Sequence, residues 1–271
     1  MLVKGVLLIM DQYSEFMANI KELCRLDLNL YKEKQMKRRI KSLIKKNGLG
    51  DFNSYFNLLR RSSRHMQEFL GYITINVSEF FRNPQQWQLL EKEIIPELIS
   101  KKDCLNIWSC ACASGEEPYS IALLLMKIHL FEKVHILATD IDIDAINDAK
   151  TGIYHQKSLV NIPGDLLKLY FIDKGNGFFE IKETIRKKVS FKCLNLLEDD
   201  FPNNMDLIIC RNVLIYFTEK AKEKLYPKFF KSLVNNGILF VGSTEQIIMP
   251  QKYGFLSTKS FFYKKTAYEK K

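Results

Sequence analysis

The stretch that decides the fold reads Trp108-Ser109-Cys110-Ala111-Cys112-Ala113-Ser114-Gly115-Glu116-Glu117-Pro118-Tyr119. It predicts a strand that starts near Leu105, a tight turn of small side chains, and then a helix. Ser114 stands three positions before Glu117, which is the spacing of a capping box at a helix N-terminus. Small side chains let a ligand approach the backbone, so the turn is a candidate binding site. The alternative is an ordinary strand-to-helix turn of any α/β protein.

The class of ligand follows from Asp140, which comes directly after the next apolar run, 134–139. Nucleotide-binding folds place a ribose-binding carboxylate at about this distance beyond the turn. The signature Gly-x-Gly-x-x-Gly is absent because the turn has one glycine, Gly115, and a pyrophosphate needs backbone approach at more than one. These features disfavour NAD and favour S-adenosylmethionine, which carries no phosphate.

The composition is that of a globular protein with one good core and room for a second small one, since 46% of its 271 residues are hydrophobic. The six cysteines include no Cys-x-x-Cys pair and have no neighbouring histidines, so we expect no metal site. Several lie in apolar runs that suit reduced thiols, and we expect a cytoplasmic protein. Residues 1–10 are too short to span a bilayer and lack a convincing signal-peptide cleavage region, and Met10 is an alternative start.

The net charge of +10 is concentrated in one segment, 31–46, which has eight lysines and arginines against the single acid Glu33. Apolar residues recur through this segment at helical spacing and predict a buried face: Met36, Ile40, Leu43 and Ile44. The basic remainder is either a surface for an acidic partner or a solvated helix face.

The first part of the chain, from 11 to about 71, has helical periodicity and predicts a small all-helical domain. Asn47-Gly48 is expected to end one helix, and Asp51 to cap the next. Alternation over 72–78 predicts an extended segment, within a linker (72–83) that contributes to the cofactor site. Asn83-Pro84 begins a further helix, in which Pro96 is expected to produce a kink or an end.

The second part, a predicted C-terminal domain from 84 to 271, alternates between strands and helices, which is typical of a parallel sheet. Strands are expected at 104–110, 134–139, 189–194, 206–210 and 237–242, helices at 118–130 and 144–150, and a closing antiparallel pair at 255–257 and 260–264. The fold class is therefore α/β, a doubly wound, mostly parallel sheet with an antiparallel edge strand. Between 152 and 188, a short helix (164–171), a Gly175-Asn176-Gly177 turn and a strand (178–182) indicate a small antiparallel β insertion.

Polar residues follow several strands at their carboxyl ends, where open sheets of this kind bind ligands. Asp140 offers a carboxylate to two ribose hydroxyls, and Asn195 offers an amide to an adenine edge, although both residue types are also common turn formers. The strand 206–210 is followed by Arg211-Asn212-Val213-Leu214-Ile215-Tyr216-Phe217, an apolar run whose polar groups need partners.

Five motifs in this order resemble those of the chemotaxis receptor methyltransferases, the CheR family. They are Asn76-x-Ser78-x-Phe80-Phe81-Arg82, Ser114-Gly115-Glu116-Glu117-Pro118-Tyr119-Ser120, Asp140-Ile141-Asp142, Asn195-Leu196-Leu197 and Cys210-Arg211-Asn212-Val213-x-Ile215-Tyr216-Phe217. The resemblance implies a class I, Rossmann-like methyltransferase that uses S-adenosylmethionine and releases S-adenosylhomocysteine. It implies methylation of glutamate side chains of methyl-accepting chemotaxis receptors. The expected activity is therefore that of a protein-glutamate O-methyltransferase that acts in receptor adaptation.

The resemblance also implies the site residues. Those expected around the cofactor are Asn76, Ser78, Arg82, Glu117, Asp140, Asn195, Leu196, Arg211 and Asn212. Arg82 and Tyr216 are expected nearest the reacting centre as catalytic residues. Ser78 stands where threonine is common in the family, and both side chains carry a hydroxyl. Glu117 has a competing role as a helix cap, and Glu116 is the alternative ligand.

The expected partner is the cytoplasmic helical bundle of the receptors, with no membrane insertion of the enzyme. A receptor glutamate, with a pKa of about 4.3, is already ionised, so the enzyme has to align it rather than deprotonate it. Lys37, Arg38 and Lys41 are expected to steer the enzyme to this acidic bundle. Many family members bind a receptor C-terminal pentapeptide through a longer glycine-containing loop. The segment 172–177 is about three residues shorter, so we expect no tight pentapeptide binding.

Two other functions are compatible with parts of the sequence. The basic helix and the sequence pI of about 9.2 would permit an RNA methyltransferase. The Asn/Asp-Pro-Pro-aromatic motif of enzymes that methylate base or amide nitrogens is missing, however, and we expect no nucleic-acid partner. A non-catalytic module that binds S-adenosylmethionine is the second alternative, and Arg82 and Tyr216 argue against it.

Overall fold

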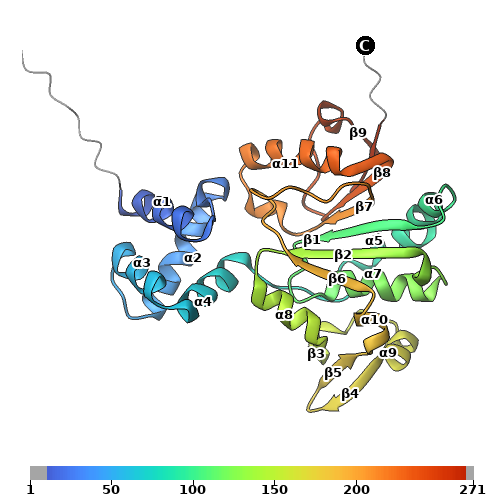
Figure 1. Cartoon of the computed structure of the whole chain (residues 1–271), viewed down its shortest axis with the longest axis horizontal. Coiled ribbons are helices and arrows are strands. Elements are labelled where there is room, and N and C mark those ends of the chain that lie inside the picture. The colour runs from blue at the N-terminus through green and yellow to red at the C-terminus, as the bar shows by residue number, and fades with distance from the viewer. Residues whose placement is uncertain (1–10, 267–271) are drawn as a thin grey trace, which may run out of the picture. The chain divides into compact units, whose positions relative to one another are not determined.

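The computed structural model describes residues 11–266 and divides them into two compact units (Figure 1). The first unit consists of the described residues through Ile73 together with Tyr216–Ala221. The second consists of Thr74–Ile215 and the described residues from Lys222 onward. The expectations for residues 1–10, including Met10 as an alternative start, lie outside the described residues.

The first unit is all-helical, as the sequence predicts. Its helices are α1 (Gln12–Cys24), the 3-10 turn η1 (Leu28–Leu30), α2 (Glu33–Lys46), α3 (Phe52–Arg61) and α4 (Ser63–Thr74). Its core is aromatic, because the ring of Phe16 lies 5.5 Å from that of Phe52, 6.2 Å from that of Tyr55 and 6.1 Å from that of Phe69. Such ring pairs stabilise a small core beyond the area that they bury.

The ends of α2 and α3 follow the predicted signals. Asn47 is the C-cap of α2, and Gly48 has the positive φ (68°) that a helix stop favours. The Asp51 carboxylate accepts a hydrogen bond from the Ser54 backbone nitrogen at 2.8 Å and so caps α3. The predicted apolar face of α2 is buried in full: Met36, Ile40, Leu43 and Ile44.

The extended segment predicted at 72–78 is wrong for its first residues, because α4 continues through Thr74. Phe69 and Ile73 lie four residues apart on one face of this helix, and both are buried. Burial of that face outweighs the alternation, since Ile73 fits either a helix or a strand pattern. The chain leaves the helix at Ile75, whose φ is 56°.

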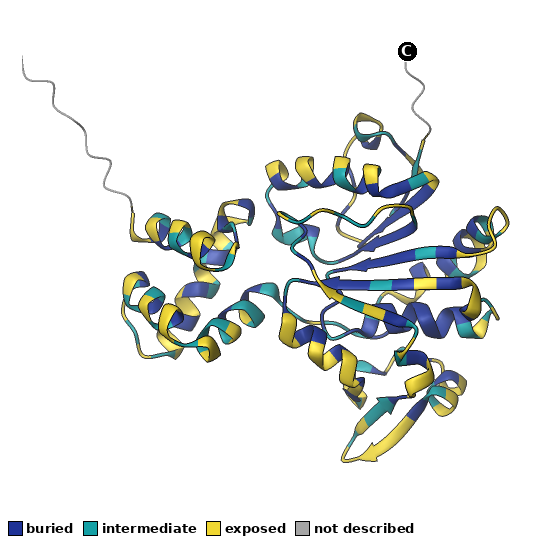
Figure 2. Cartoon of the chain, in the orientation of Figure 1, coloured by how far each residue is buried: buried dark blue, intermediate teal, exposed yellow. Residues whose placement is uncertain are grey.

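The second unit is built on a seven-stranded sheet in the order β6-β2-β1-β7-β8-β10-β9. Its strands are β1 (Leu105–Cys110), β2 (Val134–Asp140), β6 (Val189–Cys193), β7 (Met205–Cys210), β8 (Leu233–Val241), β9 (Phe255–Lys259) and β10 (Phe262–Lys265). The first five strands in that order pair in parallel, whereas β10 runs antiparallel to both β8 and β9. This confirms the predicted mostly parallel sheet with an antiparallel edge. Figure 2 shows the central strands buried along most of their length.

Beyond residue 101, two of the helices that the sequence predicts cover the large sheet, α7 (Glu116–Lys127) and α8 (Ile143–Thr151), and the third lies in the insertion described below. Pro96 does not end its helix. Instead, α5 (Pro84–Leu89) passes through a π turn, Leu90–Ile94, into α6 (Ile95–Ile99), and this turn absorbs the break that a proline imposes. A further helix, α11 (Glu219–Ser232), was not predicted and contains Pro227. Among residues 11–266, no helix has the length and apolar character needed to cross a membrane.

The predicted insertion is a separate three-stranded antiparallel sheet in the order β3-β5-β4 (Figure 1). It contains β3 (Ile153–His155), β4 (Phe171–Gly175), β5 (Phe178–Ile181) and the helices α9 (Gly164–Tyr170) and α10 (Glu183–Arg186). The predicted turn Gly175-Asn176-Gly177 closes the β4–β5 hairpin with three consecutive positive φ values, 81°, 53° and 75°. Prediction found β5 but not β3 or β4, of which β3 is only three residues long.

The turn from β1 to α7 ends at Gly115, which has a φ of 93°. A Cβ at this position would lie 2.8 Å from the Cβ of Ala149 and 3.1 Å from the hydroxyl oxygen of Tyr154. Both the backbone conformation and the space therefore require glycine, and α8 packs closely against the start of α7.

We expect Gly115→Ala to lower the free energy of unfolding by about 2 to 5 kcal/mol, the combined cost of a left-handed alanine and of overpacking. Gly48→Ala is the matched control, because Gly48 also has a positive φ (68°) but no neighbouring atom within 4 Å of an added Cβ. Its expected loss is about 1 to 2 kcal/mol. Urea denaturation measures both, and equal losses would contradict the packing argument.

Candidate functional site

The predicted capping box between Ser114 and Glu117 is wrong. Gly115 is the N-cap of α7, and the Ser114 hydroxyl donates to the carboxylate of Glu116 at 2.8 and 3.0 Å. Glu117 turns the other way and accepts a hydrogen bond from the Ser109 hydroxyl at 2.8 Å. A buried hydroxyl and a nearby cation hold this carboxylate better than the helix end does, so Glu117 has no capping role.

The two glutamates at the start of α7 are both poorly solvated. Burial raises the pKa of Glu116, and it raises the pKa of Glu117 to about 7 although the cation of Arg211 opposes that shift. The Glu117 side chain keeps 14% of its surface exposed. Glu117 is therefore a carboxyl group with a raised pKa whose side chain stays partly open to solvent.

Asp140 ends β2 and joins two turns at the carboxyl edge of the sheet. One oxygen accepts from the backbone nitrogen of Ala113 at 2.8 Å, and the other accepts from that of Asp142 at 2.9 Å. Burial raises its pKa, and these backbone hydrogen bonds oppose the shift. A carboxylate has about four acceptor positions, so Asp140 retains acceptor capacity for a ligand hydroxyl.

The linker is tied to this edge by polar contacts along its length. The Asn76 amide donates to the Asp142 carboxylate at 2.7 Å, and the Ser78 hydroxyl contacts Glu116. At the end of the linker, the guanidinium of Arg82 donates to the carbonyl oxygen of Val77 at 3.2 Å and keeps part of its surface exposed. Asn76 and Ser78 are thus positioned by residues next to the turns after β2 and β1, and Arg82 by the linker itself.

Arg211, which follows β7, connects the linker to two helices through a buried guanidinium. Nη2 donates to the Arg82 carbonyl at 2.8 Å, to Asn83 Oδ1 at 3.1 Å and to Gln86 Oε1 at 2.8 Å. Nη1 lies 3.4 Å from a carboxylate oxygen of Glu117. This one side chain therefore has partners in the linker, in α5 and in α7.

Gln86 is a residue of this cluster that sequence reasoning missed. It is buried on α5, where an amide on an apolar helix face is a signal that a polar partner is present. Its oxygen must face Arg211, which directs its Nε2 away. Within residues 11–266, Gln86 Nε2 and Arg211 Nε are both buried without a hydrogen-bond partner.

The loop after β6 contains Asn195 and Leu196. The Asn195 side-chain oxygen accepts from the Leu197 backbone nitrogen at 3.0 Å, so the turn-forming role that the sequence left open is realised. The Leu194 backbone nitrogen donates to the Asp140 carbonyl oxygen at 2.8 Å. This hydrogen bond places the start of the loop beside the end of β2.

Lys228 of α11 also holds this loop, and sequence reasoning missed it. Its ammonium group donates to the carbonyl oxygens of Leu196 at 3.0 Å and Asp199 at 2.7 Å. Burial lowers the pKa of Lys228, and nearby carboxylates oppose that shift. The backbone at Leu196 is thus fixed by a side chain 32 residues further along the chain.

Asn212 lies at the carboxyl end of β7 with a left-handed backbone (φ 60°), and its backbone nitrogen donates to the Glu245 carboxylate at 2.6 Å. All nine predicted cofactor residues belong to the second unit, and they lie in the linker, at the start of α7, or at or just after the ends of strands. Tyr216 belongs to the first unit and is the last residue of the 3-10 turn η5 (Leu214–Tyr216). Its carbonyl oxygen accepts a hydrogen bond from the backbone nitrogen of Lys32.

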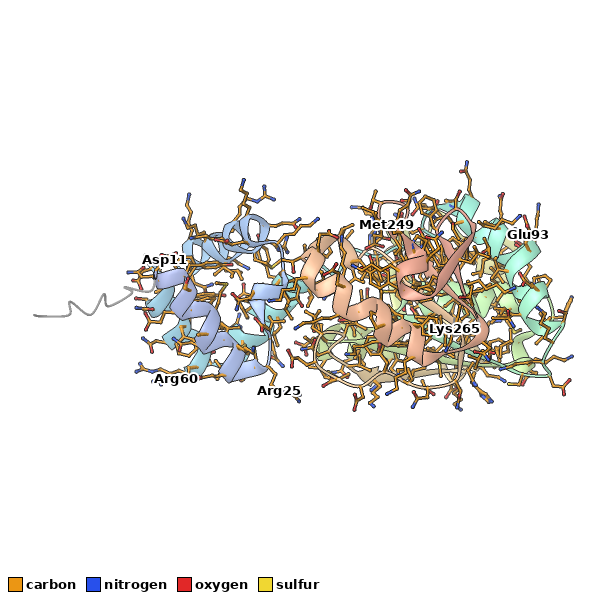
Figure 3. All side chains as sticks on the ribbon, turned by 90° about the horizontal axis from the view of Figure 1, so that it is seen from above. Asp11, Arg25, Arg60, Glu93, Met249 and Lys265 are labelled. Carbon is orange, nitrogen blue, oxygen red and sulfur yellow. The ribbon has the colours of Figure 1, made fainter. Side chains whose placement is uncertain are left out.

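The three basic residues predicted to bind a partner differ in their surroundings on α2. Lys37 forms an ion pair with Asp11 at 3.2 Å and lies 4.7 Å from the ring centre of Tyr13. Arg38 and Lys41 keep more of their surface open to solvent: both are exposed, whereas Lys37 is partly exposed. Figure 3 shows long side chains that project outward around the helices of the first unit.

Two family models match the chain. The model described as "CheR methyltransferase, SAM binding domain" matches residues 76–262, and the model described as "CheR methyltransferase, all-alpha domain" matches residues 11–74.

The chain is also similar to curated proteins over most of its length. It is 42% identical over 255 residues to a chemotaxis protein methyltransferase of Listeria innocua, covering 94% of this chain and 97% of the relative. It is 37% identical over 249 residues to a chemotaxis protein methyltransferase of Borreliella burgdorferi, covering 83% of this chain and 88% of the relative. A methyltransferase structure from Methanosarcina mazei aligns with a TM-score of 0.34 at 18% identity, covering 59% of this chain and 62% of the other.

Proposed function

The chain belongs to the CheR methyltransferase family, and from this premise we propose that it methylates glutamate side chains of methyl-accepting chemotaxis receptors in the cytoplasm. Family membership establishes a methyltransferase that binds S-adenosylmethionine. The receptor glutamate as acceptor and the methyl ester as product are the proposed part. The observation that carries the proposal is the set of carboxylates and the guanidinium gathered at the carboxyl ends of β1, β2 and β7.

These residues fit S-adenosylmethionine. The Asp140 carboxylate holds backbone N–H groups on both oxygens and keeps acceptor capacity for ribose hydroxyls. The partly exposed carboxylate of Glu117 suits the α-ammonium group of the cofactor. The amide of Asn195 and the backbone at Leu196 are assigned to the adenine, and Asn76, Ser78, Arg82, Arg211 and Asn212 complete the cofactor site.

The bound cofactor supplies an electrophilic methyl group on a sulfonium sulfur. In the proposed transfer, a bond forms between a receptor carboxylate oxygen and the methyl carbon, the carbon–sulfur bond breaks, and its electron pair stays on sulfur. No proton has to move, because the acceptor is already ionised. The task of the protein is alignment, which can lower a barrier by roughly 7 to 11 kcal/mol. Arg82 and the Tyr216 hydroxyl are assigned to orient the acceptor carboxylate.

We expect Arg82→Ala and Tyr216→Phe each to lower kcat by about 100-fold, because a small misplacement of the acceptor costs about that much. The measurement is base-labile transfer of labelled methyl groups to receptor-rich membranes. Calorimetry with S-adenosylhomocysteine is the control, and Tyr216→Phe should leave its Kd within about threefold of the wild-type value. Near-normal turnover in both variants would remove the assignment.

The raised pKa of Glu117, about 7, predicts that cofactor binding depends on pH. If the ionised carboxylate holds the α-ammonium group, affinity for S-adenosylhomocysteine should rise roughly eightfold from about pH 6 to about pH 7.5, the ratio of ionised fractions for a pKa of about 7. Glu117→Gln removes the titrating group and should flatten this dependence. Titration calorimetry across the pH range measures both proteins.

The pH dependence of the free energy of unfolding is an independent check that Glu117 is the titrating group. The folded-state pKa of Glu117 is raised above the ordinary value, so the stability that its neutral form contributes is present at low pH and is lost as pH rises through about 7. Glu117→Gln should not show this loss. An equal pH dependence of affinity in the variant and the wild type would exclude Glu117 as the ligand of the ammonium group.

The proposed partner is an acidic helical bundle, and the basic residues of α2 support this part of the proposal. Arg38 and Lys41 are exposed and Lys37 is partly exposed, beside the buried apolar face of α2. Opposite charges on two surfaces raise the rate of encounter and make it depend on salt. We also propose that the enzyme does not depend on a receptor pentapeptide, because the β4–β5 hairpin closes through the short turn at 175–177.

We expect the combined reversal of Lys37, Arg38 and Lys41 to glutamate to lower receptor methylation at low salt by roughly tenfold or more, and less at high salt, where charges are screened. The matched control reverses Lys220, Lys224 and Lys231, which are exposed on α11 and change the net charge equally. Both proteins should bind S-adenosylhomocysteine normally. Equal methylation rates for the two variants would show that α2 has no specific role.

A further inference from the structure

Glu245 lies beyond β8, in a tight turn that begins at Gly242, and its carboxylate is buried. One carboxylate oxygen accepts from the backbone nitrogens of Asn212 at 2.6 Å and Gly242 at 2.8 Å. The other accepts from the backbone nitrogen of Ile215 at 3.1 Å. A single side chain thus satisfies backbone donors from the ends of two neighbouring strands, β7 and β8.

The approach of Glu245 to this backbone leaves no spare room. A Cβ at Gly242 would overlap a carboxylate oxygen of Glu245 and would lie 3.0 Å from the backbone nitrogen of Asn212. Gly242 is therefore required by the position of the Glu245 carboxylate. The turn from Gly242 closes through a hydrogen bond from the Glu245 nitrogen to the Gly242 carbonyl at 3.0 Å.

The segment that Glu245 holds is the one that carries Arg211 and Asn212. This segment leaves β7 with Asn212 in a left-handed conformation, which a non-glycine residue adopts at a cost. Its nitrogens at Asn212 and Ile215 are satisfied by Glu245. Burial of the carboxylate is itself unfavourable, and the backbone donors compensate for it.

We propose that Glu245 is a positioning residue for methyl transfer, because its carboxylate fixes residues 211–215 and thereby places Arg211 and Asn212 at the cofactor. This inference rests on the proposed cofactor contacts of those two residues. Glu245 acts through the backbone that it holds, because its carboxylate accepts hydrogen bonds from the backbone nitrogens of Asn212, Ile215 and Gly242.

An amide cannot replace this carboxylate. Glutamine has nearly the same size, but one of its two terminal atoms is an NH2 group that would face a backbone N–H donor. Glu245→Gln therefore loses at least one of these hydrogen bonds and creates a repulsive contact. The segment should relax away from position 245, and the change should move Arg211 and Asn212.

Asp206 provides a matched control at the other end of β7. It is also buried, and its carboxylate accepts from the Asn106 backbone nitrogen at 2.8 Å and from Lys102 at 2.6 Å. It lies near the amino end of the strand, away from the carboxyl edge that carries the site residues. Asp206→Asn should therefore weaken the fold without changing the cofactor site.

The experiment compares wild type, Glu245→Gln and Asp206→Asn by urea denaturation, by calorimetry with S-adenosylhomocysteine and by methyl-transfer kinetics. We expect both variants to lose stability, whereas only Glu245→Gln raises the Kd for S-adenosylhomocysteine, by about tenfold, and lowers kcat. Wild-type Kd and kcat in a folded Glu245→Gln protein would overturn the inference and leave Glu245 a purely structural role.

Two further sets of variants keep the result interpretable. Gly242→Ala retains the Glu245 carboxylate but displaces it, so it should raise the same Kd even if Glu245→Gln does not fold, and an unchanged Kd would count against the inference. Asn212→Ala and Arg211→Ala test the underlying contacts. If these two variants bind S-adenosylhomocysteine as the wild type does, the proposed cofactor contacts are wrong. If these two variants lose affinity but Glu245→Gln and Gly242→Ala do not, the contacts stand and only the role of Glu245 is rejected.

Discussion

The buried guanidinium of Arg211 is the interaction on which the rest of the site depends. A cation removed from water is tolerated only when it is paired and hydrogen-bonded. Arg211 meets this requirement with the Arg82 carbonyl, Asn83, Gln86 and Glu117, which come from the linker, α5 and α7. Because these partners lie between 94 and 129 residues before Arg211 in the sequence, satisfying this one cation brings the end of the linker to the carboxyl edge of the sheet.

The carboxylates of the same edge are held by a second kind of contact, the backbone N–H groups that turns leave unpaired. Asp140 accepts from the nitrogens of Ala113 and Asp142, and Glu245 accepts from those of the turns after β7 and β8. Each carboxylate therefore fixes the turns around it while the backbone compensates for the loss of water. Asp140 is the last residue of β2, and Glu245 lies in a hydrogen-bonded turn directly after β8, so both carboxylates are held close to strand ends, which suits a site that works by alignment.

The sequence predicted the fold well where short-range patterns and burial agree. The strand before Gly115, the end of α2 at Gly48 and the cap at Asp51 all depend on neighbouring residues alone. Prediction failed where a distant contact competed with a local one. Glu117 has the spacing of a helix cap, but its carboxylate binds Ser109 and Arg211 instead. The alternation over 72–78 predicted an extended segment, but α4 continues through Thr74 because Ile73 is buried on a helix face shared with Phe69.

The sequence by itself determined the α/β class, the helical first part, the inserted antiparallel sheet and, through five motifs, the residues that gather at the strand ends. The tertiary structure decided which of these side chains form hydrogen bonds with one another and which remain open to a ligand. It also revealed Gln86, Lys228 and Glu245, whose most distant hydrogen-bond partners given above are 125, 32 and 33 residues away in the chain. The physical reason is that a buried polar group must find its hydrogen-bond partners in three dimensions, and sequence spacing does not encode contacts between segments that only the folded sheet brings together.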